Sequence, residues 1–188
     1  MPLNQDAILG VQNPLLQQLL SDHWEDQLRR FPVDASRLGD HRYDALLART
    51  NPEAVAEGYN LQRQFLKRAQ SIPAASLNEA DQLTQELFVD LLETNLQGEV
   101  CHTEQWGLSA RNNPLVDIEY LPEVQPISTP QDGENLAARY LAAPTLVADT
   151  IASLRSGITA GRTPVADSVH RVSDQLDQWL ATPCDQTA

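Results

Sequence analysis

The chain has 188 residues, a formal net charge of −13 and an apolar fraction of 41%, values that fit one folded domain and argue against wholesale disorder. So acidic a surface disfavours nucleic acid and anionic membranes as partners. Leucine and alanine dominate while aromatic residues make up only 5%, a balance that favours helices over strands.

The sequence also predicts the cellular compartment of the protein and the redox state of its two cysteines. The opening residues lack the basic and apolar regions of a signal peptide, and no window approaches the ~20 apolar residues of a membrane span. We therefore expect a cytoplasmic protein in which Cys101 and Cys184 are reduced thiols.

Two helices are predicted first along the chain. Asn13-Pro14 and Asn51-Pro52 each combine an N-cap residue with a proline at the first helical position. Apolar residues then recur at helical spacing until Pro32 and Pro73, which cannot continue a helix.

The third predicted helix runs from Ser76 to Gly98. Ser76 and Glu79 have the spacing of a capping box, and Gly98 is a natural stop. Its apolar face is unusually broad and predicts packing against more than one neighbour. That face comprises Ala80, Leu83, Leu87, Phe88, Leu91 and Leu92.

Residues 99–128 predict an irregular crossing segment, punctuated by prolines, with one extended stretch at "VDIEY". In an extended segment the carboxylates of Asp117 and Glu119 face the same side. Such a pair can divide acid and base roles, although a solvated strand face with the same pattern is the commoner case.

Three more helices complete the pattern. Thr129-Pro130 begins one, Pro144 begins or kinks the next, which Gly161 ends, and Thr163-Pro164 begins the last, closed by Pro183. About six amphipathic helices predict an all-α fold packed as antiparallel hairpins. We expect a single domain over residues 13–182, with tails at 1–12 and 183–188.

No familiar catalytic motif is present. A helical zinc site would need His-Glu-x-x-His, yet no histidine is followed by glutamate. His23 and Glu25, like His102 and Glu104, are two residues apart, which on a helix points them in different directions. The stretch "GITAGRTP" from Gly157 is one residue short of a phosphate-binding loop, and a glycine stop followed by a helix start explains it better.

The stretch "FPVDASRLGDHRYDALL" over residues 31–47 is the densest in polar groups. Loops between rigid helices often carry binding groups, which makes part of it a candidate cleft-lining motif. The alternative is a local turn network with Arg37 or Arg42 paired to a neighbouring aspartate. The six candidate residues are Gly39, Asp40, His41, Arg42, Tyr43 and Asp44.

The motif "SRLGDHRYDALL", followed in order by "YNLQRQFLKRAQSI", "LNEADQLTQELFVDLLE" and "YLAAPTLVADTIASLRSGITAGRTP", resembles the N-terminal region of the bacterial domain of unknown function 885 family. The resemblance implies a helical fold and a relation to longer, zinc metallopeptidase-like proteins. The metal motif of those proteins, His-Glu-x-x-Pro-Gly-His, is absent here. Zinc is thus implied only for full-length family members, and we expect no catalytic residue, metal ligand or cofactor in this chain.

Two hypotheses follow. In the first, the chain is a non-catalytic N-terminal part of a metallopeptidase-like protein, inactive alone, whose partner is a C-terminal catalytic region or a second copy in a homodimer. In the second, it is a free-standing helical module that binds a protein or a small molecule. A severed half should expose a large apolar face.

Overall fold

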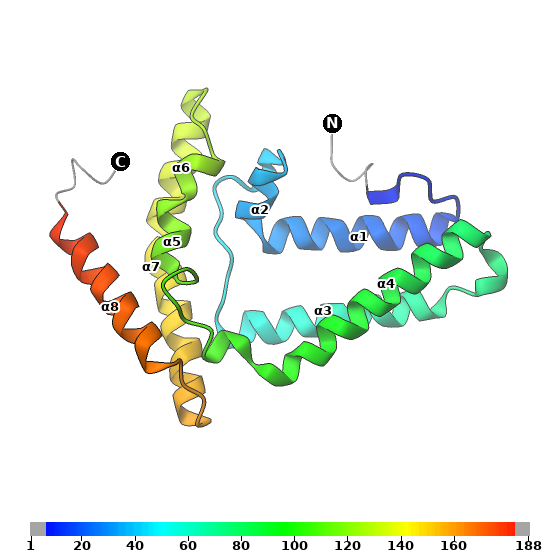
Figure 1. Cartoon of the computed structure of the whole chain (residues 1–188). Helices are drawn as coiled ribbons and strands as arrows, with labels where there is room; N and C mark the ends of the chain where they lie inside the picture. The colour runs from blue at the N-terminus through cyan, green and yellow to red at the C-terminus, as the bar shows by residue number, and fades with distance from the viewer. Residues whose placement is uncertain (1–6, 183–188) are drawn as a thin grey trace.

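A computed structural model describes residues 7–182, and it confirms the all-α class, with no strand among those residues (Figure 1). The whole predicted C-terminal tail, 183–188, lies outside the described residues with Pro183 and Cys184, as do residues 1–6 of the predicted N-terminal tail. In chain order the α-helices are α1 Pro14–Arg30, α2 Pro32–Arg37, α3 Pro52–Ser71, α4 Glu79–Gln97, α5 Pro114–Glu119, α6 Leu121–Val124, α7 Pro130–Thr159 and α8 Ala166–Ala181.

Three predicted helix starts are confirmed with their caps. The side chain of Asn13 accepts from the N–H groups of Leu15 and Leu16, and Asn51 accepts from that of Ala54. Thr129 forms a full capping box with Asp132, which is a pairing that the sequence pattern had not indicated.

Two other starts differ from prediction. The cap of α4 is Asn78, which accepts from the N–H of Asp81, whereas the hydroxyl of Ser76 donates to the carbonyl of Pro73. Ser76 lies in a 3₁₀ turn before the helix, so it cannot reach Glu79 as a capping box requires. After Thr163-Pro164 the chain stays extended, and α8 begins at Ala166 without a side-chain cap.

Pro144 lies inside α7 and does not divide it. The whole helix is 30 residues long, so the helix predicted to begin at Thr129-Pro130 and the one predicted to follow it at Pro144 are a single helix. The prolines of 99–128 also differ from expectation. Pro114 and Pro122 occupy first-turn positions of α5 and α6, where a missing N–H costs nothing, and they start helices there. Consequently residues 116–119 of "VDIEY" are helical and not extended, and Tyr120 is the C-cap of α5.

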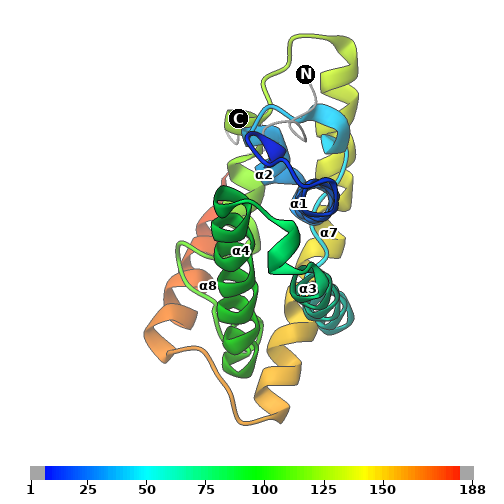
Figure 2. The same cartoon turned by 90° about the vertical axis from the view of Figure 1, so that its right-hand side faces the viewer.

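The main apolar core lies between α1, α3 and α4 (Figure 2). Figure 2 looks along α1, with α3 and α4 beside it and α7 behind. Burial of these side chains, at about 1.5–3 kcal/mol each, holds the three helices together. The predicted packing as antiparallel hairpins is not confirmed, and α7 crosses these helices steeply. The core side chains are Leu16, Leu19, Phe65, Ala69, Ile72, Leu77, Phe88 and Leu92.

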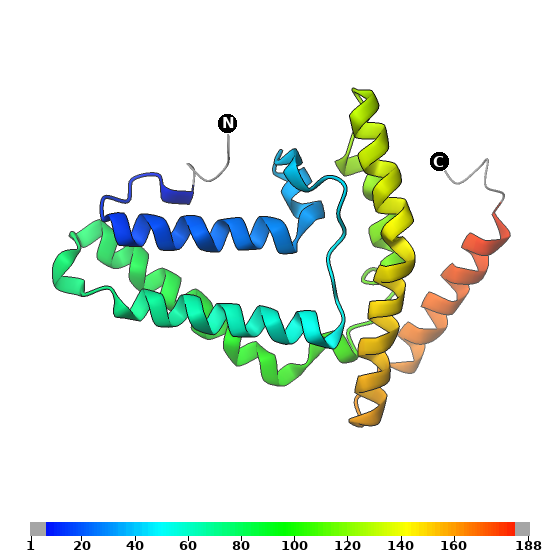
Figure 3. The ribbon, with the colours of Figure 1, turned by 180° about the vertical axis from the view of Figure 1, so that it is seen from behind.

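A second organising element is the connection over residues 44–51, which runs along α7 (Figure 3). Polar side chains of α7 hold it at successive points: Arg139 binds the carbonyl of Leu46, and Ser153 donates to that of Thr50. The carboxylate of Asp149 accepts from the side chain of Arg49 and from the backbone N–H of Thr50 in the same connection. Backbone groups that a loop would otherwise expose are satisfied in this way.

The last helix is loosely attached. Among the residues of α8, only Val172 is buried. Gln175 donates to the carbonyl of Ala110 and accepts from Asn113, and these contacts join α8 to the segment before α5.

Candidate functional site

The stretch 31–47 folds as α2 followed by a 3₁₀ turn over His41–Tyr43 (η2). Between them Gly39 has φ +85°, a conformation that only glycine adopts without strain. Asp40 then caps the turn by accepting from the N–H of Arg42. Local turn chemistry therefore determines how the candidate motif is displayed.

An ion cluster on the surface ties this turn to α1. Arg42 contacts both carboxylate oxygens of Asp40, the closest at 2.6 Å, and both of Glu25, at 2.9 and 3.0 Å. Hydrogen bonds from Arg42 lower the pKa of Glu25 and of Asp40. Partial burial, and then its hydrogen bond to Glu25, raise the pKa of Tyr43. Both pairings of the turn-network alternative form, since Arg37 also contacts Asp34 at 2.8 Å.

Beneath the surface cluster lies a fully buried arginine, Arg139 of α7. Its guanidinium donates to Gln125 Oε1 at 2.7 Å and to the hydroxyl of Ser36 at 2.8 Å. It also binds three carbonyls of the stretch 31–47, those of Pro32, Tyr43 and Leu46. Desolvation lowers its pKa, and the nearby carboxylate of Asp44 opposes that shift.

Asp44 is the buried counter-charge of Arg139. One of its carboxylate oxygens lies 3.8 Å from Arg139 Nη2 and accepts from the Ser36 hydroxyl at 2.5 Å. The other lies 2.8 Å from Nδ1 of His41, whose ring is mostly exposed. We call Arg139, Asp44, Ser36 and Gln125 the polar clamp. It fastens the stretch 31–47 to α7. Removing Arg139 or Asp44 would leave the other charge buried without its counter-charge.

The six candidate residues thus have two different placements. Asp40 and Asp44 are buried, whereas His41 and Arg42 point outward beside Tyr43. Other residues line the cavities described below. A role for the motif in a cleft wall stays a prediction.

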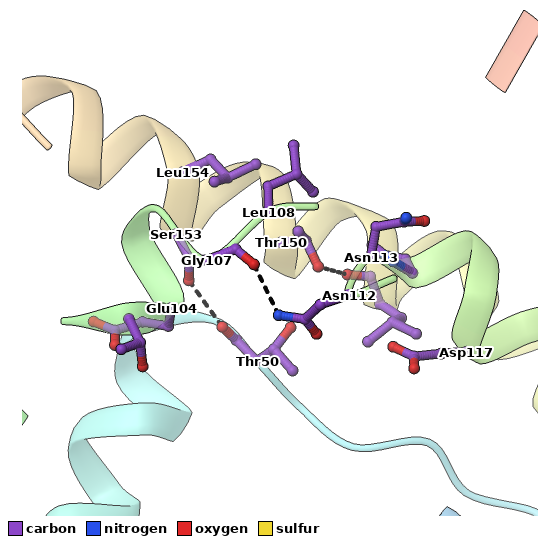
Figure 4. A pocket seen from close by; sticks show the side chains of 13 residues that line it. Thr50, Glu104, Gly107, Leu108, Asn112, Asn113, Asp117, Thr150, Ser153 and Leu154 are labelled. Atoms are coloured by element: carbon purple, nitrogen blue, oxygen red, sulfur yellow. Dashed lines mark hydrogen bonds between the residues drawn. The ribbon is translucent and has the colours of Figure 1, made fainter. Parts of the chain in front are cut away.

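One cavity of about 180 Å³ lies between α7, the α5 start and residues 103–108 (Figure 4). Its polar walls largely bond to one another: Ser153 donates to Thr50, and Asn112 Nδ2 donates to the carbonyl of Gly107 at 2.8 Å. Partial desolvation raises the pKa of Asp117, which lies at its edge.

The predicted carboxylate pair is not formed. Because residues 117–119 are helical, Asp117 faces this cavity while Glu119 lines a different one between α5 and α8. Residues two apart on a helix point to different sides. The prediction that these two carboxylates face the same side and could divide acid and base roles is therefore wrong.

His23 and His102 lie in separate surroundings. His23 packs edge-on between Phe65 and Phe88, and burial lowers its pKa. His102 has φ +45° in a 3₁₀ region, so Nδ1 approaches Glu104 at 3.5 Å, a contact that the helical expectation had excluded. Within residues 7–182 no group of three or more His, Cys, Asp or Glu could hold a metal ion.

The glycines of "GITAGRTP" have packing and stop roles. Gly161, at φ +75°, ends α7 as predicted. At Gly157 a side chain would overlap the carbonyl of Gln105, so this glycine lets residues 103–107 lie against α7.

Sequence reasoning missed Arg139 and Asp149, the two charged residues that α7 buries. Arg139 follows Leu136 by three positions and so shares its inward stripe. An arginine on an apolar stripe was the available signal. Helical spacing could not predict that the partners of Arg139 lie in the distant stretch 31–47.

The fold and its clamp define an all-α protein in which a Gly-Asp-His-Arg-Tyr-Asp turn is fastened to a long helix. Residues 32–188 match the family described as bacterial protein of unknown function (DUF885). The chain belongs to this family. A search of curated proteins found no match. None of the helices in residues 7–182 is long and apolar enough to cross a membrane.

Proposed function

We propose that this chain is a non-catalytic helical scaffold of a metallopeptidase-like protein, inactive alone, whose apolar outer faces pack against a further region that carries the catalytic groups. The observation that carries the proposal is a row of exposed leucines on α4. Leu83, Leu87 and Leu91 recur every four residues and are 57%, 61% and 48% exposed. They are three of the six residues in the broad apolar face of α4, which the sequence predicts to pack against more than one neighbour.

Further apolar side chains are exposed on the opposite part of the molecule. On α7 they include Leu141 and Ile158, and on α8 Val169, Leu176 and Leu180. A helix as amphipathic as α8 usually buries its apolar face, yet here one residue does so. Large apolar side chains that stay exposed along amphipathic helices are expected where a further surface covers them.

The alternative is a free-standing helical module. The same faces would then bind a protein partner, or close on a second copy of the chain. A homodimer that is stable at low concentration, and whose α4 leucines are protected, would favour this alternative.

The test measures zinc, peptidase turnover and the apolar face together. We expect the purified chain to hold no stoichiometric zinc, to cleave no peptide and to bind an apolar fluorescent dye such as ANS. Replacing the three α4 leucines with glutamine should remove most of the dye signal. The matched control, Glu86→Gln with Asp90→Asn on exposed positions of the same helix, should not. Stoichiometric zinc with turnover would overturn the proposal, as would a dye signal that the leucine variant leaves unchanged.

A further inference from the structure

The second cavity of the molecule is larger, about 440 Å³, and lies between the end of α1, the first half of α3 and residues 48–50 and 103–104. Phe31, Ala48 and Val55 give it apolar walls. Thr50 lines both this cavity and the cavity of Figure 4, whereas Arg30 and Gln62 line only this one of the two.

Three buried polar atoms on its lining residues make no hydrogen bond with any of residues 7–182: Arg30 Nη1, Thr50 Oγ1 and Gln62 Oε1. Buried polar atoms are almost always paired, so three unpaired ones around a single cavity call for an explanation. They belong to three different elements, yet all three side chains line the same space. A bound molecule that pairs with them explains the arrangement.

Arg30 is the only charge among these three residues. Its Nη1 forms a long ion pair with Asp26 Oδ2, at 3.8 Å. Neither of these two atoms makes a hydrogen bond with any described residue. The other arginine of the cavity, Arg49, is held by Asp149 at 2.7 Å. Arg30 therefore has an ion-pair partner in Asp26 but keeps its hydrogen-bonding N–H groups for a second anion.

A glycine in the middle of α3 accommodates this arginine. A side chain at Gly58 would overlap the guanidinium of Arg30, which lies against the helix there. Glycine in a helix interior is unfavourable compared with alanine, so its presence needs a reason. The close approach of Arg30 supplies that reason.

The charges around the cavity select the kind of anion. Glu104 also lines it, Asp26 lies nearby, and the whole chain has a net charge of −13. A doubly charged phosphate is repelled by these carboxylates more strongly than a singly charged carboxylate is. Gln62 Oε1 requires a hydrogen-bond donor, and the apolar walls require an apolar body.

We propose that this cavity binds a small monocarboxylate with an apolar body and a hydrogen-bond donor, its carboxylate held by Arg30 and its donor by Gln62. The hydroxyl of Thr50 completes the set. Small side-chain rotations, common when ligands enter, bring the buried atoms to the cavity surface. The proposal is independent of the apolar outer faces and of any peptidase.

The probe is 4-hydroxybenzoate, titrated into the ¹⁵N-labelled full chain and followed by NMR. We expect saturable shifts around Arg30, Thr50 and Gln62. Benzoate, which lacks the donor, should bind more weakly. Methyl 4-hydroxybenzoate, which lacks the charge, and inorganic phosphate should not bind there.

Variants separate the charge from its placement. Arg30→Gln should weaken binding about tenfold or more. Gly58→Ala keeps the charge and favours the helix but displaces the guanidinium, so it should weaken binding while the spectrum stays folded. The control, Arg63→Gln, removes an exposed arginine of α3, the helix that contains Gly58, and should leave the binding affinity unchanged. No saturable binding, equal binding of the ester or phosphate, or wild-type affinity in both Arg30→Gln and Gly58→Ala would overturn the proposal.

Discussion

Two regions of the molecule are held together by different chemistry. The α1, α3 and α4 unit has an apolar core, whereas the stretch 31–51 is attached to α7 by buried polar and charged side chains. Apolar packing tolerates exchange of similar side chains, but a buried charge network fails when one member is lost. The two regions should therefore respond differently to substitution and to pH.

The largest effect is expected at the polar clamp. Arg139→Met removes the buried guanidinium and leaves Asp44 without its buried counter-charge, which should cost about 3–5 kcal/mol of unfolding free energy. Urea unfolding followed by circular dichroism measures the loss. Arg155→Met, at an exposed position of the same helix, is the control and should stay within about 0.5 kcal/mol of wild type. Equal effects of the two changes would refute the clamp.

The apolar core should show a smaller, volume-dependent loss. Leu92 is fully buried, and Leu92→Ala should destabilise by about 2–5 kcal/mol through lost burial and a cavity. Its neighbour Leu91 is 48% exposed, so Leu91→Ala should change stability by less than about 0.5 kcal/mol. Thermal unfolding of the pair tests whether α4 buries only one side.

Acid should affect the two regions in different pH ranges. His23 has a lowered pKa because it is buried, so the folded state binds fewer protons and stability falls as the pH drops below about 6.5. Asp149 has a pKa lowered mainly by its hydrogen bond from Arg49, so its contribution is complete above about pH 4 and is lost below that. His23→Leu should flatten the first decline and Asp149→Asn the second. Unfolding measured from pH 8 to 3 would contradict both assignments if neither variant changed the profile.

The smallest effect concerns the turn that displays the candidate motif. Gly39→Ala places a side chain at φ +85° and should cost about 1–2 kcal/mol. Gly98 has φ −67° in the helical region, so Gly98→Ala should be neutral or stabilising. A comparison of the two melting temperatures decides whether backbone strain matters at Gly39.

The two regions also differ in how far sequence predicts them. Caps at Asn13 and Asn51 and the apolar stripes of α1 and α3 depend on neighbours a few residues away, so local spacing was sufficient. The expectation that a new helix begins at Pro144 was wrong, because α7 continues through this proline, and its packing against other elements is not visible in local spacing. At Pro114 and Pro122 a helix start looks the same as a helix break.

The candidate site was predicted only in its local part. Gly39 and Asp40 form the turn that their residue types indicate, and Arg37 and Arg42 pair with neighbouring aspartates. The clamp was missed because Asp44 and Arg139 meet only in the folded chain. The same holds for Arg30 and Gly58, which are adjacent only once α1 and α3 pack.

The most direct test of the central claim is a double-mutant cycle between Asp44 and Arg139. Asp44→Asn, Arg139→Met and the double variant are compared by urea unfolding at neutral pH. If the buried polar clamp fastens the stretch 31–47 to α7, the coupling free energy should be about 1–3 kcal/mol, with the double variant less destabilised than the sum of the two single changes. A coupling near zero would contradict the account, because the two residues would then act independently.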